Sequence, residues 1–562
     1  MRHIHPQLWA MALLSGVLQI LPFPVAGPTP LWRTAFCWIA LLPLLWALVA
    51  GKRDVTPPTA VQGAALGYVC GIAWYMGNCY WIYPTMYLYG GLAKPIAAGI
   101  LVLFCFYLGL YYAVFGALIA ACRMRFGREK ALLVVPFAWV AVELARARIT
   151  GLPWDLLGMA QVDNPMLTRL APFTGAYGIS FVIALVNALF LTRIRFRERR
   201  YTRLLLSVGG VALVVMYVIS LRFFLPEASA TTSATATLVQ ENIEVGAANI
   251  GPQPTQEQYL RSFSYLSRFP SSHYFLGTPG LAGTQSVYVL RPHSPGDGTS
   301  VPMATDLIVW PESPAPFQDV DPQFLAAMQS LARATHAPII VGNTGFEPNR
   351  NSRSGYTPFN RASFFDSNGT YIAHYDKMHL VPFGEYVPFR RIFFFAKDLL
   401  NEVGTFEPGT RRSVFKTGSN VYGTFICYES IFGDEVRQYA QEGADVLVNI
   451  SNDGWYGDTS APWQHLNMVR MRAIENHRWV LRATNTGVTA AIDPSGRVTE
   501  AAPRHLRTSI RVHFGYEHDL TFYSSHGDLF AYACAIVASA VWAMTFIGRP
   551  GRPSTMRAVP EA

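Results

Sequence analysis

The sequence contains few charged residues. Asp, Glu, Lys and Arg make up 14% of its 562 residues, against about 25% in an ordinary soluble domain. Hydrophobic residues account for 51%. This composition excludes a disordered chain, a collagen-like fibre and a small disulfide scaffold, and it argues against a wholly soluble enzyme. The length suffices for two or three domains.

Cysteine is scarce where the chain is least apolar. Of seven cysteines, only Cys427 lies between residues 225 and 528, so that segment cannot form an internal disulfide. Such a lone thiol is either a buried core residue or a functional one. The others lie in or beside apolar runs, where a small apolar side chain is ordinary: Cys37, Cys70, Cys79, Cys105, Cys122 and Cys534.

Long apolar runs dominate the N-terminal part and recur near the C-terminus. Spanning a bilayer takes about 20 residues per helix, and eight runs qualify: 8–26, 31–50, 61–83, 96–121, 131–146, 172–192, 204–224 and 529–547. They predict a polytopic α-helical membrane domain of about eight spans. The first run has features of a secretory signal, but Pro22, Pro24 and the second run favour a retained helix. Glu143 and Arg146, in the fifth, suit a transport path or a structural ion pair.

The net charge of +9 is concentrated beside these runs. The basic blocks lie at 52–53, 123–130, 193–203 and 549–557. Because Lys and Arg concentrate in cytoplasmic loops, both termini are expected inside and the segment 225–528 outside. The charge is not gathered on one face, so no nucleic-acid binding is expected. We therefore divide the chain into 1–224 (spans one to seven), 225–528 (an outer domain) and 529–562 (the last span and a cytoplasmic tail).

The outer segment alternates short strands with helices, after a linker at 225–236. Helices are predicted at 322–335, 430–442 and 461–478, and a hairpin at 488–498. The stretch 270–303 reads as an irregular insertion. The pattern predicts α/β layers. Strands are predicted at 237–240, 307–310, 338–342, 362–365, 371–375, 422–427, 446–450 and 480–483.

Cys427 ends one predicted strand and precedes a helix predicted to start near Ser430. The positive end of a helix dipole favours a thiolate. Glu312 and Lys377 also follow predicted strands. A carboxylate and an ammonium are the base and the oxyanion stabiliser that a thiol nucleophile requires, although each residue alone also fits an ordinary surface position.

Other chemistries have weaker support. A Ser-His-Asp triad would draw on His379, His465 or His477, but no Gly-x-Ser-x-Gly elbow accompanies them. The histidines and cysteines lack the spacing of a metal site, so neither a metal nor a cofactor is expected.

Three motifs in order carry a resemblance. Trp-Pro-Glu (310–312), Lys-Met-His-Leu-Val-Pro-Phe-Gly-Glu (377–385) and Cys-Tyr-Glu (427–429) resemble the Glu-Lys-Cys site of the nitrilase superfamily. With the membrane spans, the chain resembles the bacterial apolipoprotein N-acyltransferase family over nearly its whole length. Further matching stretches are Gly-Leu-Pro-Trp (151–154), 451–458, Gln-His-Leu (464–466), 482–487 and 521–528.

This resemblance implies an αββα nitrilase-like sandwich on the outer face of the bacterial inner (plasma) membrane. It implies that a phospholipid acyl chain passes to the active-site thiol as a thioester, and then to the N-terminal amine of a diacylglyceryl-Cys on an apolipoprotein. Cys427 is then the nucleophile, Glu312 the base and Lys377 the oxyanion partner, together with a backbone N–H near Tyr428. A monomer is expected. The residues implied to support the site are Glu385, Glu429, Asn360, Tyr428, Trp455 and Tyr456.

Two departures leave substrate contacts open: the insertion 270–303 and the segment 243–255. The apolar segment 387–400 is either a loop that dips into lipid or a core-packing helix. Two other functions remain as alternatives. A membrane-anchored amidase would share the triad without needing eight spans, and a transporter or scaffold with an inactive outer domain would have no reactive thiol.

Overall fold

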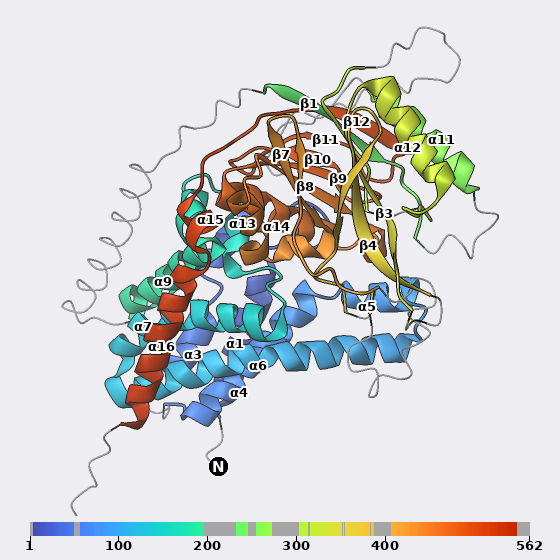
Figure 1. Cartoon of the computed structure of the whole chain (residues 1–562). Helices are drawn as coiled ribbons and strands as arrows, with labels where there is room; N and C mark the ends of the chain where they lie inside the picture. Colours follow the sequence, from blue (N-terminus) through green and yellow to red (C-terminus); the bar gives the residue numbers. More distant parts are fainter. Residues whose placement is uncertain are drawn as a thin grey trace, which may run out of the picture.

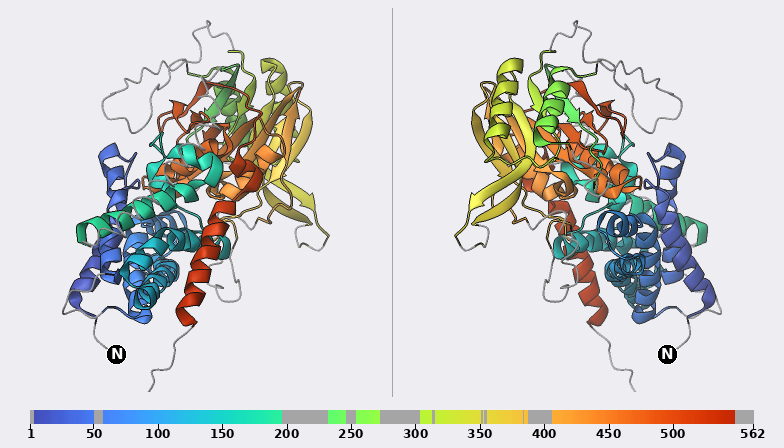
Figure 2. Two further views of the ribbon diagram at one scale, coloured as in Figure 1. Left: turned by 90° about the vertical axis from the view of Figure 1, so that its left-hand side faces the viewer. Right: turned by 90° about the vertical axis from the view of Figure 1, so that its right-hand side faces the viewer.

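Two six-stranded β-sheets lie face to face above a group of long helices (Figure 1). The computed structural model describes residues 4–49, 57–195, 232–245, 254–271, 303–312, 315–350, 352, 355–382, 384–386 and 406–547. The views of Figure 2 show that helix α16 (Leu529–Phe546) runs from the sheets down along the other helices.

Each sheet has three parallel strands flanked by antiparallel ones. Strands β1, β2 and β3 are parallel in the first sheet, and β7, β8 and β9 in the second. The first sheet has the order β12 (Thr508–Phe514), β1 (Ala234–Gln240), β2 (Leu307–Val309), β3 (Ile339–Pro348), β4 (Tyr356–Phe365), β5 (Tyr371–Asp376). The second has the order β11 (Val498–Ala501), β10 (Ala490–Ile492), β9 (Trp479–Thr484), β8 (Val446–Ser451), β7 (Asn420–Ile426), β6 (Val414–Thr417).

Successive side chains of each strand point to opposite faces of its sheet, and this builds a four-layer sandwich. In β1, Leu238 points into the core between the sheets, which Phe425 of β7 also joins. The next residue, Val239, joins Phe263 and Phe324 in a separate core under the outer helices. These helices are α11 (Gln256–Arg268) and α12 (Pro322–Thr335), while α13 (Gly433–Gln441) and α14 (Ala461–Asn476) cover the second sheet. Because both faces of the central strands are covered, they read as continuous apolar runs. The predicted αββα sandwich is therefore confirmed.

All eight predicted strands are present, and the predicted hairpin is β10–β11. Strand β1 begins at Ala234, inside the stretch predicted as a linker. The sequence analysis missed α11, β6 and β12. The segment 387–400 lies outside the described residues, as does most of the predicted insertion and of the segment 243–255.

Within the described residues, three apolar stretches are long enough to cross a membrane: Leu31–Val49, α6 (Lys94–Phe126) and α16. Helices α1 (Pro6–Ile20) and α9 (Ala176–Arg195) are apolar but present shorter apolar stretches. The total of about eight spans stays a prediction, and the run 204–224 lies outside the described residues. The other main helices of this part are α3 (Leu42–Val49), α4 (Ala60–Asn78) and α7 (Arg128–Ala145).

Glycines bring α4 and α6 into close contact. A Cβ added to Gly63 would lie 2.5 Å from the Gly116 carbonyl oxygen, and one added to Gly67 would lie 2.1 Å from the Tyr112 oxygen. Small residues at such crossings let helix backbones approach one another, as is common where no water drives helix association.

Helix α14 forms the junction between the sandwich and the membrane helices. Nearly all of it is buried, although it carries many polar side chains. These side chains bind partners across the junction: Arg470 pairs with Asp163, and Glu475 accepts from the Ala176 amide at 3.0 Å. A polar helix buried on all sides needs such partners, because unsatisfied groups there would be costly.

Candidate active site

Cys427 follows strand β7 directly and has a left-handed backbone, with φ at +49°. For a residue with a side chain this conformation costs free energy and is typical of functional turns. The residue is buried, with 5% of its surface exposed. The sharp turn places the thiol at the carboxyl end of the parallel strands, where open α/β sheets gather chemistry.

The helix predicted over 430–442 is α13, which begins later than expected. Residues Cys427–Ile431 form a short 3₁₀ turn, and α13 begins only at Gly433. Burial and the Glu312 carboxylate raise the pKa of the Cys427 thiol, while Lys377 lowers it. The net shift is upward. Burial and a neighbouring negative charge thus oppose the thiolate that the sequence analysis expects, and the Lys377 cation favours it.

Lys377 lies between two carboxylates. Its Nζ is 3.0 Å from Glu312 Oε1 and 3.0 Å from Glu385 Oε1, and only 1% of its surface is exposed. Burial lowers the pKa of Lys377, but the charges of Glu312 and Glu385 outweigh it and raise the pKa well above its ordinary value. The side chain is thus an ammonium fixed beside the thiol.

Asn360 of strand β4 binds the same two carboxylates. Its Nδ2 donates to Glu312 Oε1 at 2.7 Å and to Glu385 Oε1 at 2.6 Å. The remaining oxygens accept backbone amides: Glu312 Oε2 from Asn452 at 2.8 Å, and Glu385 Oε2 from Val381 at 2.8 Å. Both carboxylates are therefore held rigidly, as a preorganised site requires.

Glu429 joins the lysine loop to the cysteine turn. Its Oε1 accepts from the Tyr375 hydroxyl at 2.6 Å and from the amides of Met378 at 2.7 Å and His379 at 3.1 Å. Its Oε2 accepts from the Ile426 amide at 2.7 Å. Burial raises the pKa of Glu429, and these bonds oppose the rise. Glu429 thus fixes the chain next to Lys377 and next to Cys427.

The three predicted aromatic residues occupy different places. Tyr428 is buried and donates its hydroxyl to the Gly151 carbonyl at 3.2 Å. The Tyr456 ring packs 5.2 Å from Trp81 and 6.2 Å from Trp154, between sandwich and membrane helices. Trp455 is half-buried in the turn η9 (Asp453–Tyr456). Among the described residues it shares no hydrogen bond with Glu312, Lys377 or Cys427.

The histidines do not form a serine triad within the described chain. His379 faces Glu435, His477 faces Asp519, and His465 faces Asp453, with no serine hydroxyl bonded to any of the three rings. The ligand atoms of His477, Glu517 and Asp519 lie within 4.8 Å of one another. Oδ1 of Asp519 there pairs with His477 and Arg478.

Two contacts of the site were missed from sequence. The Asn452 amide binds Glu312, and His465 Nε2 lies 3.0 Å from the Cys427 carbonyl oxygen. Their motifs, 451–458 and Gln-His-Leu, were noted for resemblance only. Nothing in their spacing shows that both reach the same strand ends.

Two family models match this chain. Residues 297–511 match the carbon-nitrogen hydrolase family model, and residues 15–189 match the apolipoprotein N-acyltransferase N-terminal domain. The apolipoprotein N-acyltransferase of Geobacter metallireducens is 35% identical over 96% of this chain and 95% of its own. This chain belongs to the apolipoprotein N-acyltransferase family.

A second relative and a solved structure are less similar to this chain. The Methylococcus capsulatus enzyme of that name is 32% identical over 89% of this chain and 88% of its own. Among solved structures, Saccharomyces cerevisiae Nit3, a member of the nitrilase superfamily, is 17% identical with a TM-score of 0.35, over 53% of this chain and 95% of that chain. That score is too low to bear on function.

Proposed function

We propose that the protein transfers an acyl chain from a membrane phospholipid to the N-terminal amine of the diacylglyceryl-Cys of apolipoproteins, through a thioester on Cys427. The observation that carries the proposal is the buried Lys377 ammonium, fixed 3.0 Å from Glu312 and 3.0 Å from Glu385 and acting electrostatically on the thiol. Family membership adds the substrate class.

In the first half-reaction, Glu312 takes the proton of the thiol as the sulfur attacks the ester carbonyl. This assignment suits a thiol that is neutral at rest. Lys377 and the Tyr428 N–H stabilise the oxyanion. The C–O bond then breaks, and Glu312 returns the proton to the departing lysophospholipid alkoxide.

In the second half-reaction, an uncharged acceptor amine attacks the thioester carbonyl. Glu312 takes a proton from the attacking nitrogen and returns it to the departing sulfur, which restores the thiol. Each half-reaction balances with the chain's own groups. Water must be excluded from the thioester, because its attack would release a fatty acid instead.

The remaining site residues support this chemistry. Asn360 and Glu385 hold the Glu312–Lys377 pair, and Glu429 holds the two loops that carry Lys377 and Cys427. Tyr428 and Tyr456 link the site to membrane helices. We assign Trp455 to the surroundings of the site.

The same proposal includes the location. The chain is a monomer in the bacterial inner membrane, with about eight spans, the division 1–224, 225–528 and 529–562, cytoplasmic termini and a periplasmic sandwich. The basic blocks beside the apolar runs support this topology. Figures 1 and 2 show the sandwich at one end of the membrane helices only, as one-sided exposure requires.

A transfer assay tests the proposal. The full chain in detergent is given a phospholipid with a labelled acyl chain and a synthetic diacylglyceryl-Cys lipopeptide. We expect the label to reach the peptide amine with the wild type and not with Cys427→Ala. Release of ammonia from small amides without labelling of the peptide would support an amidase, and neither signal would leave a scaffold or transporter; both outcomes contradict the proposal.

A further inference from the structure

Two motifs without an assigned role meet behind the nucleophile. Trp154 ends the Gly-Leu-Pro-Trp motif of the membrane domain, and Gln464 and His465 begin the Gln-His-Leu motif of α14. The Trp154 Nε1 donates to Gln464 Oε1 at 2.9 Å. The Trp154 ring stacks on the His465 ring, with centroids 6.0 Å apart and planes at 23°. The side chains of Trp154 and His465 are fully buried.

The far side of His465 contacts the backbone of the nucleophile. Its Nε2 lies 3.0 Å from the Cys427 carbonyl oxygen. A carbonyl oxygen can only accept, so Nε2 donates to it. Because a trans peptide is planar, its C=O and the following N–H point in opposite directions. Fixing the Cys427 carbonyl therefore also fixes the direction of the Tyr428 N–H.

The Tyr428 amide is free for a ligand by its position in the turn. It is the first amide after the start of the 3₁₀ turn Cys427–Ile431, and the first amides of a helical turn have no carbonyl partner within it. The left-handed φ of Cys427, at +49°, holds this peptide in a conformation that a non-glycine residue seldom adopts. Such a peptide needs an external contact to keep one orientation.

His465 is itself held on two sides. Its Nδ1 lies 2.9 Å from Asp453 Oδ1, and the other oxygen of Asp453 accepts from Arg482 at 2.6 Å. Histidine, aspartate and arginine are all buried. The remaining support is the Trp154 ring, which comes from the membrane domain.

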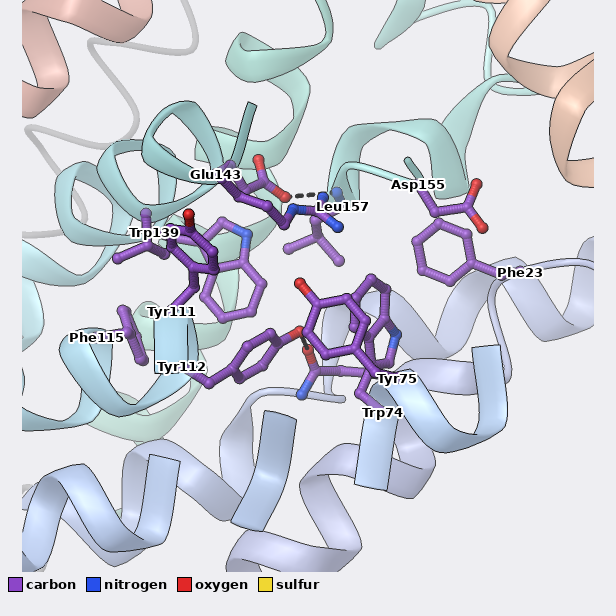
Figure 3. A pocket seen from close by; sticks show the side chains of 13 residues that line it. Phe23, Trp74, Tyr75, Tyr111, Tyr112, Phe115, Trp139, Glu143, Asp155 and Leu157 are labelled. Atoms are coloured by element: carbon purple, nitrogen blue, oxygen red, sulfur yellow. Dashed lines mark hydrogen bonds between the residues drawn. The ribbon is translucent and has the colours of Figure 1, made fainter. Parts of the chain in front are cut away.

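Polar side chains of the N-terminal helices also bind the loop that carries Trp154. Arg146 donates to the Trp154 carbonyl at 2.8 Å. Glu143 accepts from the Leu157 amide at 2.7 Å (Figure 3). Asp155 accepts from Asn78 at 2.9 Å. Glu143, Arg146 and Asp155 line a cavity of about 20 Å³ beneath the loop. Within the described chain Glu143 and Arg146 both form hydrogen bonds with this loop.

We propose that His465 is a positioning residue of acyl transfer: it orients the Cys427–Tyr428 peptide so that the Tyr428 N–H points at the oxyanion, and Trp154 of the membrane domain keeps it in place. The inference rests on the proposed function. It gives the membrane domain a part in the chemistry, beyond anchoring the sandwich.

The test compares two substitutions at His465, of which only one can still donate a hydrogen bond to the Cys427 carbonyl. In His465→Gln, the amide nitrogen stands where Nε2 stood and can still donate to Cys427. In His465→Asn, it stands near the position of Nδ1 and cannot reach that carbonyl. His477→Asn is the matched control, because His477 ends the same helix and pairs with Asp519 away from the nucleophile.

Two rates are measured on the full chain in detergent by mass spectrometry of the Cys427 peptide. One is thioester formation from phospholipid, which passes through an oxyanion; the other is alkylation by iodoacetamide, which does not. For His465→Asn we expect acylation to slow by about 10-fold to 100-fold. This effect does not exceed the loss of rate that follows removal of one oxyanion-hole donor. Alkylation should stay within about twofold of the wild type. His465→Gln should recover much of the acylation rate, and His477→Asn should match the wild type.

Unchanged acylation in His465→Asn would overturn the inference, as would a parallel loss of both rates, which indicates a purely structural role. Where His465→Asn does not fold, Trp154→Leu tests the same point by removing the ring that stacks on His465. It should slow acylation and spare alkylation, and an acylation rate equal to the wild type would overturn the inference. A wild type that forms no thioester would instead refute the proposed function.

Discussion

Lys377 donates to Glu385 at 3.0 Å, the same distance at which it meets Glu312. The ammonium is therefore shared between two carboxylates. This arrangement keeps Lys377 charged and leaves Glu312 in contact with a cation while it acts as the base. Every oxygen of Glu312 and Glu385 accepts at least one hydrogen bond. Replacing either carboxylate by an amide would therefore place the NH₂ group of the amide against another donor.

Glu385→Gln should slow thioester formation by about tenfold or more, because its amide would oppose either the Val381 N–H or the Lys377 ammonium and shift the lysine. The measurement is the rate of labelling of Cys427 by phospholipid. Glu407→Gln, at an exposed position of the same region, serves as the control and should be unaffected. Equal rates for both variants would remove Glu385 from the site.

Removing the charge of Glu312 should speed alkylation of the Cys427 thiol and, in contrast, abolish acyl transfer. Burial and Glu312 raise the pKa of Cys427, and Lys377 lowers it. Glu312→Gln therefore lowers that pKa and should speed alkylation by iodoacetamide at pH 8, while acyl transfer is lost. Lys377→Met should slow alkylation at the same pH. The check is the alkylation rate of the Cys427 peptide from pH 6 to 10. Slower alkylation in Glu312→Gln would contradict the assigned electrostatics.

Glu429→Gln should destabilise the sandwich, because an amide cannot accept all four bonds that the carboxylate accepts from Tyr375, Met378, His379 and Ile426. Hydrogen bonds to a charged group contribute about 1.5–3 kcal/mol each. We expect the unfolding midpoint in detergent to fall by about 5 °C or more. The exposed Glu442→Gln should change it little. An unchanged midpoint for Glu429→Gln would show that these four hydrogen bonds do not stabilise the sandwich.

Glu435 should make stability depend on pH. The His379 imidazole, with Nε2 3.8 Å from Glu435 Oε1, and Arg412 lower the pKa of Glu435 from 4.5 to about 2, against the effect of burial. A lowered carboxyl pKa stabilises the folded state above pH 4.5, and this contribution is lost as the pH falls toward 2. Burial lowers the pKa of His379, but Glu435 and Glu429 outweigh it and raise the pKa, so the contribution of His379 is lost as the pH rises through its folded pKa.

The comparison of the wild type with Glu435→Gln checks this dependence. The difference in their unfolding midpoints should be widest near pH 5–6 and should narrow at both lower and higher pH. A difference that does not vary with pH would show that neither group is shifted by the other.

Much of the sandwich could be predicted because its strands are short apolar runs bounded by turn residues. Leu307–Val309 and Val446–Ser451 are examples. Strand β6 was missed because it is short and polar at its end, so tertiary packing forms it more than local propensity does. Helix α11 was missed although the capping residues Thr255 and Gln258 and the helical spacing of its buried side chains are local signals.

The site itself was only partly predictable. Motif order located Glu312, Lys377 and Cys427, but the protonation of the thiol depends on burial and on Glu312, which no local pattern reports. The helix expected near Ser430 begins only at Gly433, after a 3₁₀ turn in which Glu429 binds back to the Ile426 amide. The contact of Trp154 with His465 joins residues more than three hundred positions apart, and it could be found only in three dimensions.

The central claim is that Cys427 carries the acyl chain as a thioester. The most direct measurement is mass spectrometry of the intact chain and of the Cys427 peptide after incubation with a phospholipid of defined acyl chains. The account predicts one added acyl mass on Cys427, removed by hydroxylamine and absent from Cys427→Ala. An unmodified Cys427 in a wild type that still acylates the lipopeptide, or an acyl group on another residue, would contradict it.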